Sequence, residues 1–185
     1  MKKYSLSLMV LALAMFPTFL FAQVLKVSQS DSKVEITGTS SLHDWTETVE
    51  DFYGSGNFSI ESQKVQKVEN VVLTFKVEGI KSGKSLMDKN TYNALKSEDH
   101  PTITFKSESS SISGNTISLK GKLNVAGTSK SVTLKGTYQV VNNQVKVKGE
   151  FTMDMTQYNV EPPTAMMGTI TTGKDVTIVY DVIFK

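Results

Sequence analysis

The chain has 185 residues, a formal net charge of +2 and no cysteine. All 20 of its basic residues are lysines, so it lacks the guanidinium forks that bind phosphate in a bidentate manner. A nearly neutral chain without a basic cluster argues against nucleic acid as a partner. The lack of cysteine excludes disulfides and lipid attachment through an N-terminal cysteine.

Residues 1–22 have the pattern of an export signal. Lys2 and Lys3 form a short basic start, residues 6–21 are an uncharged apolar run, and Ala22 is a small residue suited to cleavage. The run is too short and too one-sided to indicate a stable membrane span. We therefore expect residues 1–22 to be removed and residues 23–185 to form one exported domain without stable membrane insertion. Those 163 residues have a formal net charge of zero, because the signal takes away two lysines and no acid.

Most of the remaining chain alternates between apolar and polar residues, which is typical of strands with one buried and one wet face. The alternating segments are 34–38, 71–78, 103–106, 117–123, 132–138, 145–153 and 176–184. Turn-forming residues separate them at 113–115, 127–129, 142–143 and 172–174. From about residue 101 onward the pattern predicts an antiparallel meander.

One segment has helical spacing instead. Ser85 and Asp88 resemble a capping box that starts a helix. Met87, Thr91, Ala94 and Leu95 fall on one helical face, and Pro101 prevents continuation. The spacing predicts a helix of two to three turns between strands. Residues 156–167 contain two consecutive prolines and predict a loop or a single turn.

Short alternating strands with tight turns fit either a sandwich or a closed barrel. Glycines recur in phase with the apolar face, which favours the barrel: Gly38, Gly79, Gly121, Gly136 and Gly149. They have two interpretations, which are compatible. They leave room for a ligand in the lumen, or they mark the bulges and sharp bends that small barrels need.

Candidates for catalysis are few. The two histidines, His43 and His100, are far apart in sequence, and His43 cannot pair with the adjacent Asp44 because neighbouring strand residues face opposite ways. No nucleophile elbow, phosphate loop or cluster of metal ligands is present. We therefore expect a binding protein with no catalytic residue, no metal site and no cofactor. Two alternatives stay open: an enzyme that uses a histidine with a lumen carboxylate, and a structural or interaction barrel whose lumen is packed.

Aromatic and apolar residues in phase with the inner face are the candidates for ligand contact. The methionines between positions 153 and 167 add an adaptable apolar surface. The predicted lumen residues are Trp45, Phe58, Leu73, Phe75, Met87, Tyr92, Phe105, Leu123, Gly136, Phe151, Met153, Met155, Met166 and Met167. For any one of them, plain core packing is the alternative. The same alternation places Lys76, Lys106, Lys122 and Lys148 in water.

Three blocks along the chain carry a resemblance to a known family. Residues 82–105 end in Pro101-Thr102-Ile103-Thr104-Phe105, residues 121–130 follow as a hairpin, and residues 151–158 open a closing segment. In order and spacing they resemble the YceI-like family of periplasmic polyisoprenoid-binding proteins, over Val24 to Lys185. The segment Leu42-His43-Asp44-Trp45 differs from the commoner family form.

The resemblance implies an all-β fold, a single eight-stranded antiparallel lipocalin-like β-barrel with one short inserted helix. It implies that residues 23–185 bind a polyisoprenoid, an isoprenoid quinone or a fatty-acyl lipid in the lumen. The expected roles are periplasmic transport, storage or stress response. The sequence does not fix the oligomeric state, and a dimer is compatible with it.

Overall fold

The computed structural model describes residues 22–185, and the predicted export signal up to residue 21 lies outside the described residues. These residues form twelve strands and one α-helix, α1 (Ser85–Ala94), which lies between β6 and β7 in the chain. The strands are β1 (Ala22–Lys26), β2 (Lys33–Ser40), β3 (Trp45–Val49), β4 (Phe52–Glu61), β5 (Lys64–Lys76), β6 (Ile80–Lys81), β7 (Thr102–Ser113), β8 (Thr116–Val125), β9 (Thr128–Val141), β10 (Gln144–Asp154), β11 (Thr164–Ala165) and β12 (Ile170–Phe184).

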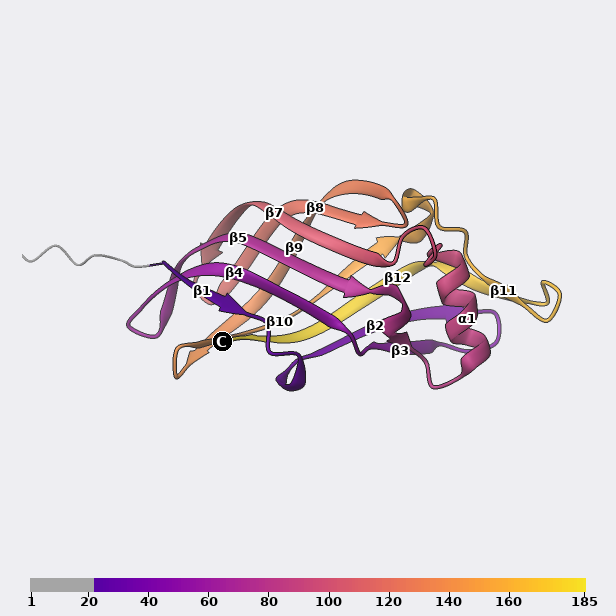
Figure 1. The fold of residues 1–185 in the computed structure, drawn as a ribbon, viewed down its shortest axis with the longest axis horizontal. Coiled ribbons are helices and arrows are strands. Elements are labelled where there is room, and N and C mark those ends of the chain that lie inside the picture. The colour runs from indigo at the N-terminus through magenta and orange to yellow at the C-terminus, as the bar shows by residue number, and fades with distance from the viewer. Residues whose placement is uncertain (1–21) are drawn as a thin grey trace, which may run out of the picture.

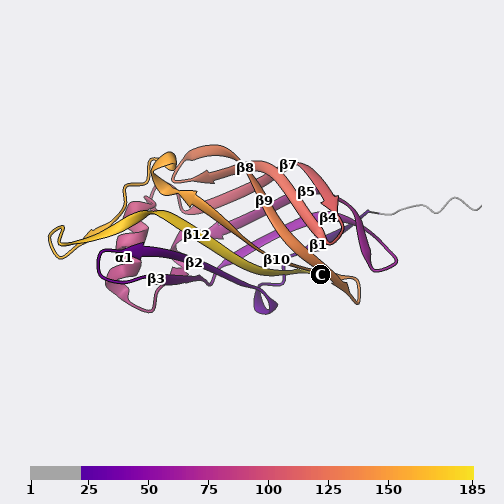
Figure 2. The ribbon, with the colours of Figure 1, turned by 180° about the vertical axis from the view of Figure 1, so that it is seen from behind.

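All strand pairs are antiparallel, in the order β1-β4-β5-β7-β8-β9-β10-β12-β2-β3-β6, with β11 paired to β12. The sheet curls into an elongated barrel. Figure 1 shows β4 and β5 on one side, and Figure 2 shows β9, β10 and β12 from behind. Helix α1 lies across one end of the barrel, and the C-terminus lies at the other. The predicted all-β barrel, the short helix and the meander after residue 101 are confirmed.

The curled sheet is joined at both of its edges. Lys26 and Lys185 exchange backbone hydrogen bonds of 2.9 and 2.8 Å, which tie β1 to the end of β12. At the other edge, β3 runs into β4 through a sharp bend, where Glu50 N donates to Gly79 O at 2.7 Å. These links leave little of the sheet edge free to pair with another chain.

The strand count differs from the predicted eight. Eight strands have eight or more residues and form the wall: β2, β4, β5, β7, β8, β9, β10 and β12. The other four are short pieces that alternation alone does not separate. The bend at Glu50–Asp51 divides β3 from β4, and a 3₁₀ turn at Val77–Gly79 divides β5 from β6.

The predicted inside and outside phase is confirmed. Phe105 pairs with Leu123 between β7 and β8, and both side chains are buried. The next pair, Lys106 with Lys122, is exposed on the outer face. Lys76 and Lys148 are exposed as well. Successive strand residues point to opposite faces, so one register fixes every side chain of the pair.

Helix α1 begins where the sequence predicts, but its cap differs. Lys84, rather than Ser85, is the N-cap residue and makes no side-chain cap. Asp88 reaches past the helix start, and its Oδ1 accepts the backbone N–H of Ser82 at 2.7 Å. The sequence pattern identified Asp88 correctly as a capping acid, but its partner is Ser82 and not Ser85, because the loop before α1 folds back over the first helical turn.

The glycines on the inner phase do not leave open space. A Cβ on Gly136 would lie 2.7 Å from Val147 Cγ1 and 2.9 Å from Lys148 O. A Cβ on Gly121 would collide with Lys106 O, beside the bulge of β7. Gly38, Gly79 and Gly149 are equally crowded. The interpretation as close approach and sheet bending holds, and the interpretation as ligand space is wrong.

Candidate ligand-binding cavity

The barrel encloses an apolar cavity of about 460 Å³. Side chains from most wall strands and from α1 line it, and most of them are aliphatic or aromatic. The volume lies within the range of small-molecule sites in proteins. The alternative of a fully packed lumen is therefore wrong.

The far end of the cavity is closed by aromatic rings. Phe58 of β4 and Phe184 of β12 both line the cavity and are buried, with ring centroids 5.0 Å apart. Their tilted arrangement, at an interplanar angle of 50°, is a favourable one for two aromatic rings. Phe184 directly precedes the C-terminal residue, and the C-terminus lies at the end of the barrel opposite α1 (Figure 1), so this pair forms the floor of the cavity at that end.

The near end is open beside α1. Leu42, in the loop between β2 and β3, and Leu86, at the start of α1, line the cavity while remaining 65% and 69% exposed. A side chain that faces both the cavity and solvent marks the rim of an opening. His43 and Lys84 are exposed lining residues at this same mouth.

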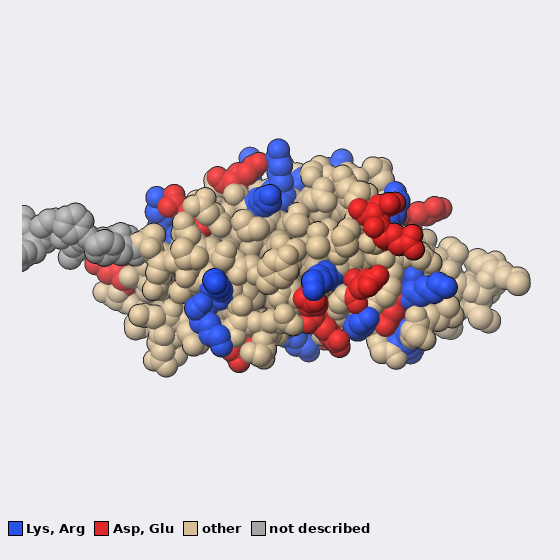
Figure 3. Space-filling view, in the orientation of Figure 1, with Lys and Arg blue, Asp and Glu red and all other residues tan. Residues whose placement is uncertain are grey.

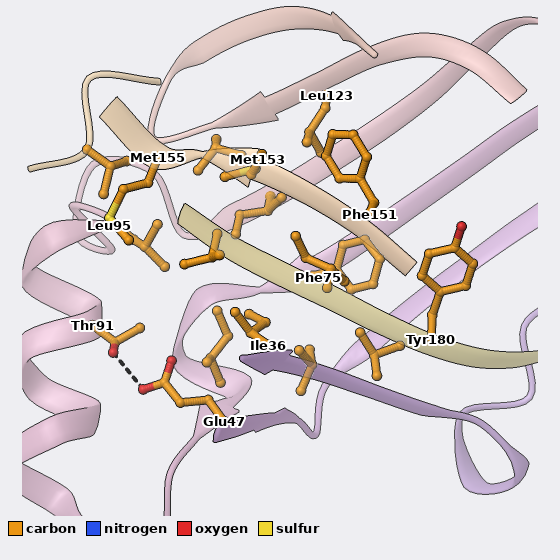
Figure 4. A pocket seen from close by; sticks show the side chains of 18 of the residues that line it. Ile36, Glu47, Phe75, Thr91, Leu95, Leu123, Phe151, Met153, Met155 and Tyr180 are labelled. Atoms are coloured by element: carbon orange, nitrogen blue, oxygen red, sulfur yellow. Dashed lines mark hydrogen bonds between the residues drawn. The ribbon is translucent and has the colours of Figure 1, made fainter. Parts of the chain in front are cut away.

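Eleven of the fourteen predicted lumen residues line the cavity. They are Trp45, Phe58, Leu73, Phe75, Met87, Phe105, Leu123, Gly136, Phe151, Met153 and Met155. Figure 4 shows Phe75, Leu123, Phe151, Met153 and Met155 gathered around the same space from different strands. The signal that identified the strand residues among them was their phase with the apolar inner face, and Met87 was identified by its helical spacing.

Tyr92 does not line the cavity. Its hydroxyl lies 2.6 Å from Lys81 Nζ and 3.0 Å from the backbone oxygens of Glu78 and Ile80. It therefore ties α1 to the connection between β5 and β6. Thr91, one position earlier, takes the cavity-facing place, because successive helical residues are about 100° apart.

Met166 and Met167 do not line the cavity either. Both lie at the exposed tip of the hairpin between β11 and β12, with φ angles of 52° and 58°. This left-handed backbone makes a tight turn and directs the side chains into solvent. Clustering in sequence with Met153 and Met155 gave no indication of the turn.

The segment Leu42–Trp45, between β2 and the start of β3, lies at the mouth of the cavity, and Leu42, His43 and Trp45 line it. His43 Nδ1 lies 2.7 Å from the backbone oxygen of Asp44, and no described hydrogen bond joins it to a carboxylate. The other histidine packs its ring against Gly127. The structure does not bring the two histidines into a shared polar cluster among residues 22–185.

The sequence profile of the YceI-like domain matches residues 25–184. The chain belongs to the YceI-like family. No curated protein matches its sequence. Three solved structures have the same fold: BcnA of Burkholderia cenocepacia, a polyisoprenoid binding domain from Saccharophagus degradans, and the YCEI protein of Campylobacter jejuni.

These relatives of the YceI-like barrel are distant in sequence. The BcnA structure is 18% identical with a TM-score of 0.72, over 85% of this chain and 98% of that one. The Saccharophagus domain is 10% identical with a TM-score of 0.67, over 87% and 97%. The Campylobacter protein is 14% identical with a TM-score of 0.62, over 74% and 82%. At such identities the likeness establishes the shared fold.

The YceI-like barrel has one lining residue of a kind that the sequence analysis missed. Glu47 of β3 lines the cavity and is only 2% exposed. Thr91 Oγ1 on α1 donates a hydrogen bond to Glu47 Oε1 at 2.6 Å (Figure 4). Burial raises the pKa of this carboxyl. Its position in phase with Trp45 and Val49 was the signal that could have identified it.

Tyr180 of β12 is a second polar group at the cavity wall. Its hydroxyl donates to the backbone oxygen of Lys135 at 2.7 Å, and burial raises its pKa to about 12. The Tyr180 hydroxyl therefore already has a hydrogen-bond partner within the barrel. Within residues 22–185 no three potential metal ligands gather, and no helix is long and apolar enough to cross a membrane.

Proposed function

We propose that this YceI-like protein is an exported periplasmic carrier that holds one long apolar lipid in its lumen without chemical change. The ligand is a polyisoprenoid, an isoprenoid quinone or a fatty-acid derivative, which the protein transports or stores. The observation that carries the proposal is the apolar cavity, closed by Phe58 and Phe184 and open beside α1. The Saccharophagus domain of the same fold, named as polyisoprenoid binding, supports it.

The cavity wall is sufficient to bind such a ligand. Each buried methylene contributes about 0.8 kcal/mol, so a chain of about twenty carbons has a gross burial term near 15 kcal/mol. Ordering the flexible chain and losing its free motion offset part of this. Affinity then comes from the wall, while the few polar groups near the mouth set selectivity.

The sequence of the N-terminal segment supports the proposed cellular location. Residues 1–22 have the pattern of a cleaved signal. The periplasm is an aqueous space between two membranes, so a long apolar lipid needs a carrier to cross it. We place lipid exchange at the mouth, where Leu42 and Leu86 extend the apolar lining to the surface.

The direct test is the lipid content of the protein. We expect organic extracts of protein purified from periplasm to contain about one long-chain lipid per molecule by mass spectrometry. Replacing Leu119, a half-buried lining residue of β8, by Trp should fill the lumen and remove most of that lipid. Lys120→Trp is the matched control, because it adds the same ring to the exposed outer face of the strand.

The outcomes separate clearly. Loss of lipid from Leu119→Trp but not from Lys120→Trp supports binding in the lumen. Equal lipid content in both variants would place the lipid outside the barrel. A lipid-free wild-type protein that also fails to take up oleyl alcohol would refute the carrier function.

A further inference from the structure

Glu47 is the only acidic side chain among the described residues that line the cavity. It projects from β3 toward α1, at the end of the cavity that opens to solvent (Figure 4). Its neighbours in the same strand phase are Trp45 and Val49, so the sequence places a carboxyl where an apolar side chain would pack. Burying such a group costs free energy unless it is hydrogen-bonded.

The hydrogen-bonding capacity of Glu47 is only partly used. Among the described residues it has one partner, the Thr91 hydroxyl on Oε1. No described residue bonds to Oε2. A neutral carboxyl has one O–H to donate, and an ionised one has several acceptor sites. Polar groups in protein interiors are normally satisfied, so the free oxygen is suited to a polar atom of a bound ligand.

The surroundings of Glu47 disfavour a negatively charged ligand head. Among the described residues that line the cavity, the basic side chains are Lys84 and His43, and both are exposed at the rim. On α1 the charge of Asp88, another acid, acts on Glu47 and raises the pKa of its carboxyl. A carboxylate or phosphate placed here would lose its water and meet acidic groups without a buried cation.

We propose that Glu47, oriented by Thr91, is the specificity-determining residue of the cavity and bonds the polar head of the ligand. It selects lipids with a neutral, hydrogen-bonding head, such as a hydroxyl or carbonyl, over lipids with an anionic head. This inference rests on the proposed function, since it names the class of lipid that the cavity takes. It also fixes the ligand's direction, with the head beside α1 and the tail toward Phe58 and Phe184.

Three probes with the same C18 chain test the head group alone: oleyl alcohol, oleate and 9-octadecene. The mature protein, residues 23–185, is delipidated and titrated with labelled oleyl alcohol or oleate at pH 7.5 by equilibrium dialysis. The alkene is measured as a competitor of the labelled alcohol. One hydrogen bond contributes about 1 kcal/mol, so we expect the alcohol to bind roughly fivefold to tenfold more tightly than the alkene. Oleate should bind at least about tenfold more weakly than the alcohol.

Two substitutions assign this preference to Glu47. Glu47→Gln keeps the shape and a hydrogen-bonding amide, so alcohol binding should stay within about threefold while oleate binding rises about tenfold. Glu47→Leu removes the polar group, so alcohol and alkene should bind equally. The control is Glu50→Gln, which neutralises an exposed acid just beyond the same strand and should behave as wild type.

The result that overturns the inference differs from the one that overturns the carrier function. If wild type and Glu47→Gln bind all three probes with the same affinities, Glu47 does not select the head, although the barrel still binds lipid. If wild type binds none of the probes, the carrier function itself fails. Glu47→Gln alone decides the matter should Glu47→Leu not fold.

Discussion

Gly38 on β2 and Trp45 on β3 are directly paired, and the indole ring of Trp45 covers the glycine. The contact is so close that a Cβ on Gly38 would overlap Cζ2 of the ring. Trp45 Nε1 also donates to Thr39 O at 3.0 Å, which fixes the ring along the strand pair. The only tryptophan of the chain is thereby held flat as part of the cavity wall.

Gly38→Ala should displace this ring. Forcing a methyl group into a filled site costs about 1–3 kcal/mol of unfolding free energy. We expect urea unfolding at lower denaturant and a red shift of tryptophan emission as the ring moves toward solvent. Thr46→Ala, which changes an exposed neighbour on β3, should alter neither. An unshifted emission spectrum in Gly38→Ala would mean that the ring accommodates the methyl in place.

Gly136→Val tests the structural role of the inner-face glycines. Because Val147 and the backbone of Lys148 already occupy the space of a Cβ, both Gly136→Ala and Gly136→Val should be destabilised. We expect a loss of about 1–3 kcal/mol for alanine and more for valine, measured by thermal unfolding. The lipid content per folded molecule of Gly136→Ala should match wild type. A valine variant with an unchanged unfolding midpoint and less lipid would restore the interpretation of these glycines as ligand space.

The wall of the barrel could be predicted because its signal is local. Phe105 beside Lys106, and Leu123 beside Lys122, assign the two faces of β7 and β8 from adjacent residues. The same phase identified strand residues of the cavity lining such as Phe75 and Phe151. Glu47 was within reach of this reasoning, since it is the one acid in phase with Trp45 and Val49. An acidic residue on a predicted apolar face is informative because burying it is costly.

The remaining differences depend on contacts between distant parts of the chain. Nothing near Gly121 in sequence shows that Lys106 O lies against it. Tyr92 has a plausible helical position, and only the fold reveals that Lys81 and the backbone of Glu78 capture its hydroxyl. Met166 is exposed by a left-handed turn that has methionine and not glycine at this position, so the sequence does not indicate the turn.

Glu47 should make stability depend on pH. Burial raises its pKa, the Thr91 hydrogen bond lowers it and the charge of Asp88 raises it, with a net upward shift. The folded state then binds more protons than the unfolded chain between the ordinary glutamate pKa of about 4.3 and the raised value. Across that window the free energy of unfolding should fall as pH rises, and it should level off above it.

Urea unfolding from pH 4 to pH 8 measures this effect. Glu47→Gln cannot ionise, so its stability relative to wild type should increase with pH through the same window. Thr91→Val removes the hydrogen bond that lowers the pKa of Glu47, so it should extend the upper end of this pH window to higher pH. Glu50→Gln, an exposed acid, should run parallel to wild type. A constant difference between Glu47→Gln and wild type at every pH would contradict the assignment.

The hairpin tip with Met166 and Met167 should speed lipid exchange with membranes. Residues 164–170 contain no charged side chain, and the side chains of Met166 and Met167 are exposed to solvent. In Figure 3 the tip that projects beyond α1 carries no blue or red, whereas lysines and acids are interspersed over the visible barrel surface. An uncharged apolar tip beside the mouth can enter the bilayer interface while a lipid moves into the cavity.

Replacing both methionines by serine tests this role. Fully burying one such apolar side chain contributes about 1.5–3 kcal/mol, so losing two partly inserted ones should slow lipid uptake from vesicles roughly tenfold. Stopped-flow transfer of a fluorescent lipid measures the rate. The affinity for oleyl alcohol should not change, because neither methionine lines the cavity.

The control is Val141→Ser, which removes an exposed apolar side chain from the hairpin between β9 and β10 and should keep the wild-type rate. Equal transfer rates in the double serine variant and wild type would show that lipid reaches the mouth without this tip.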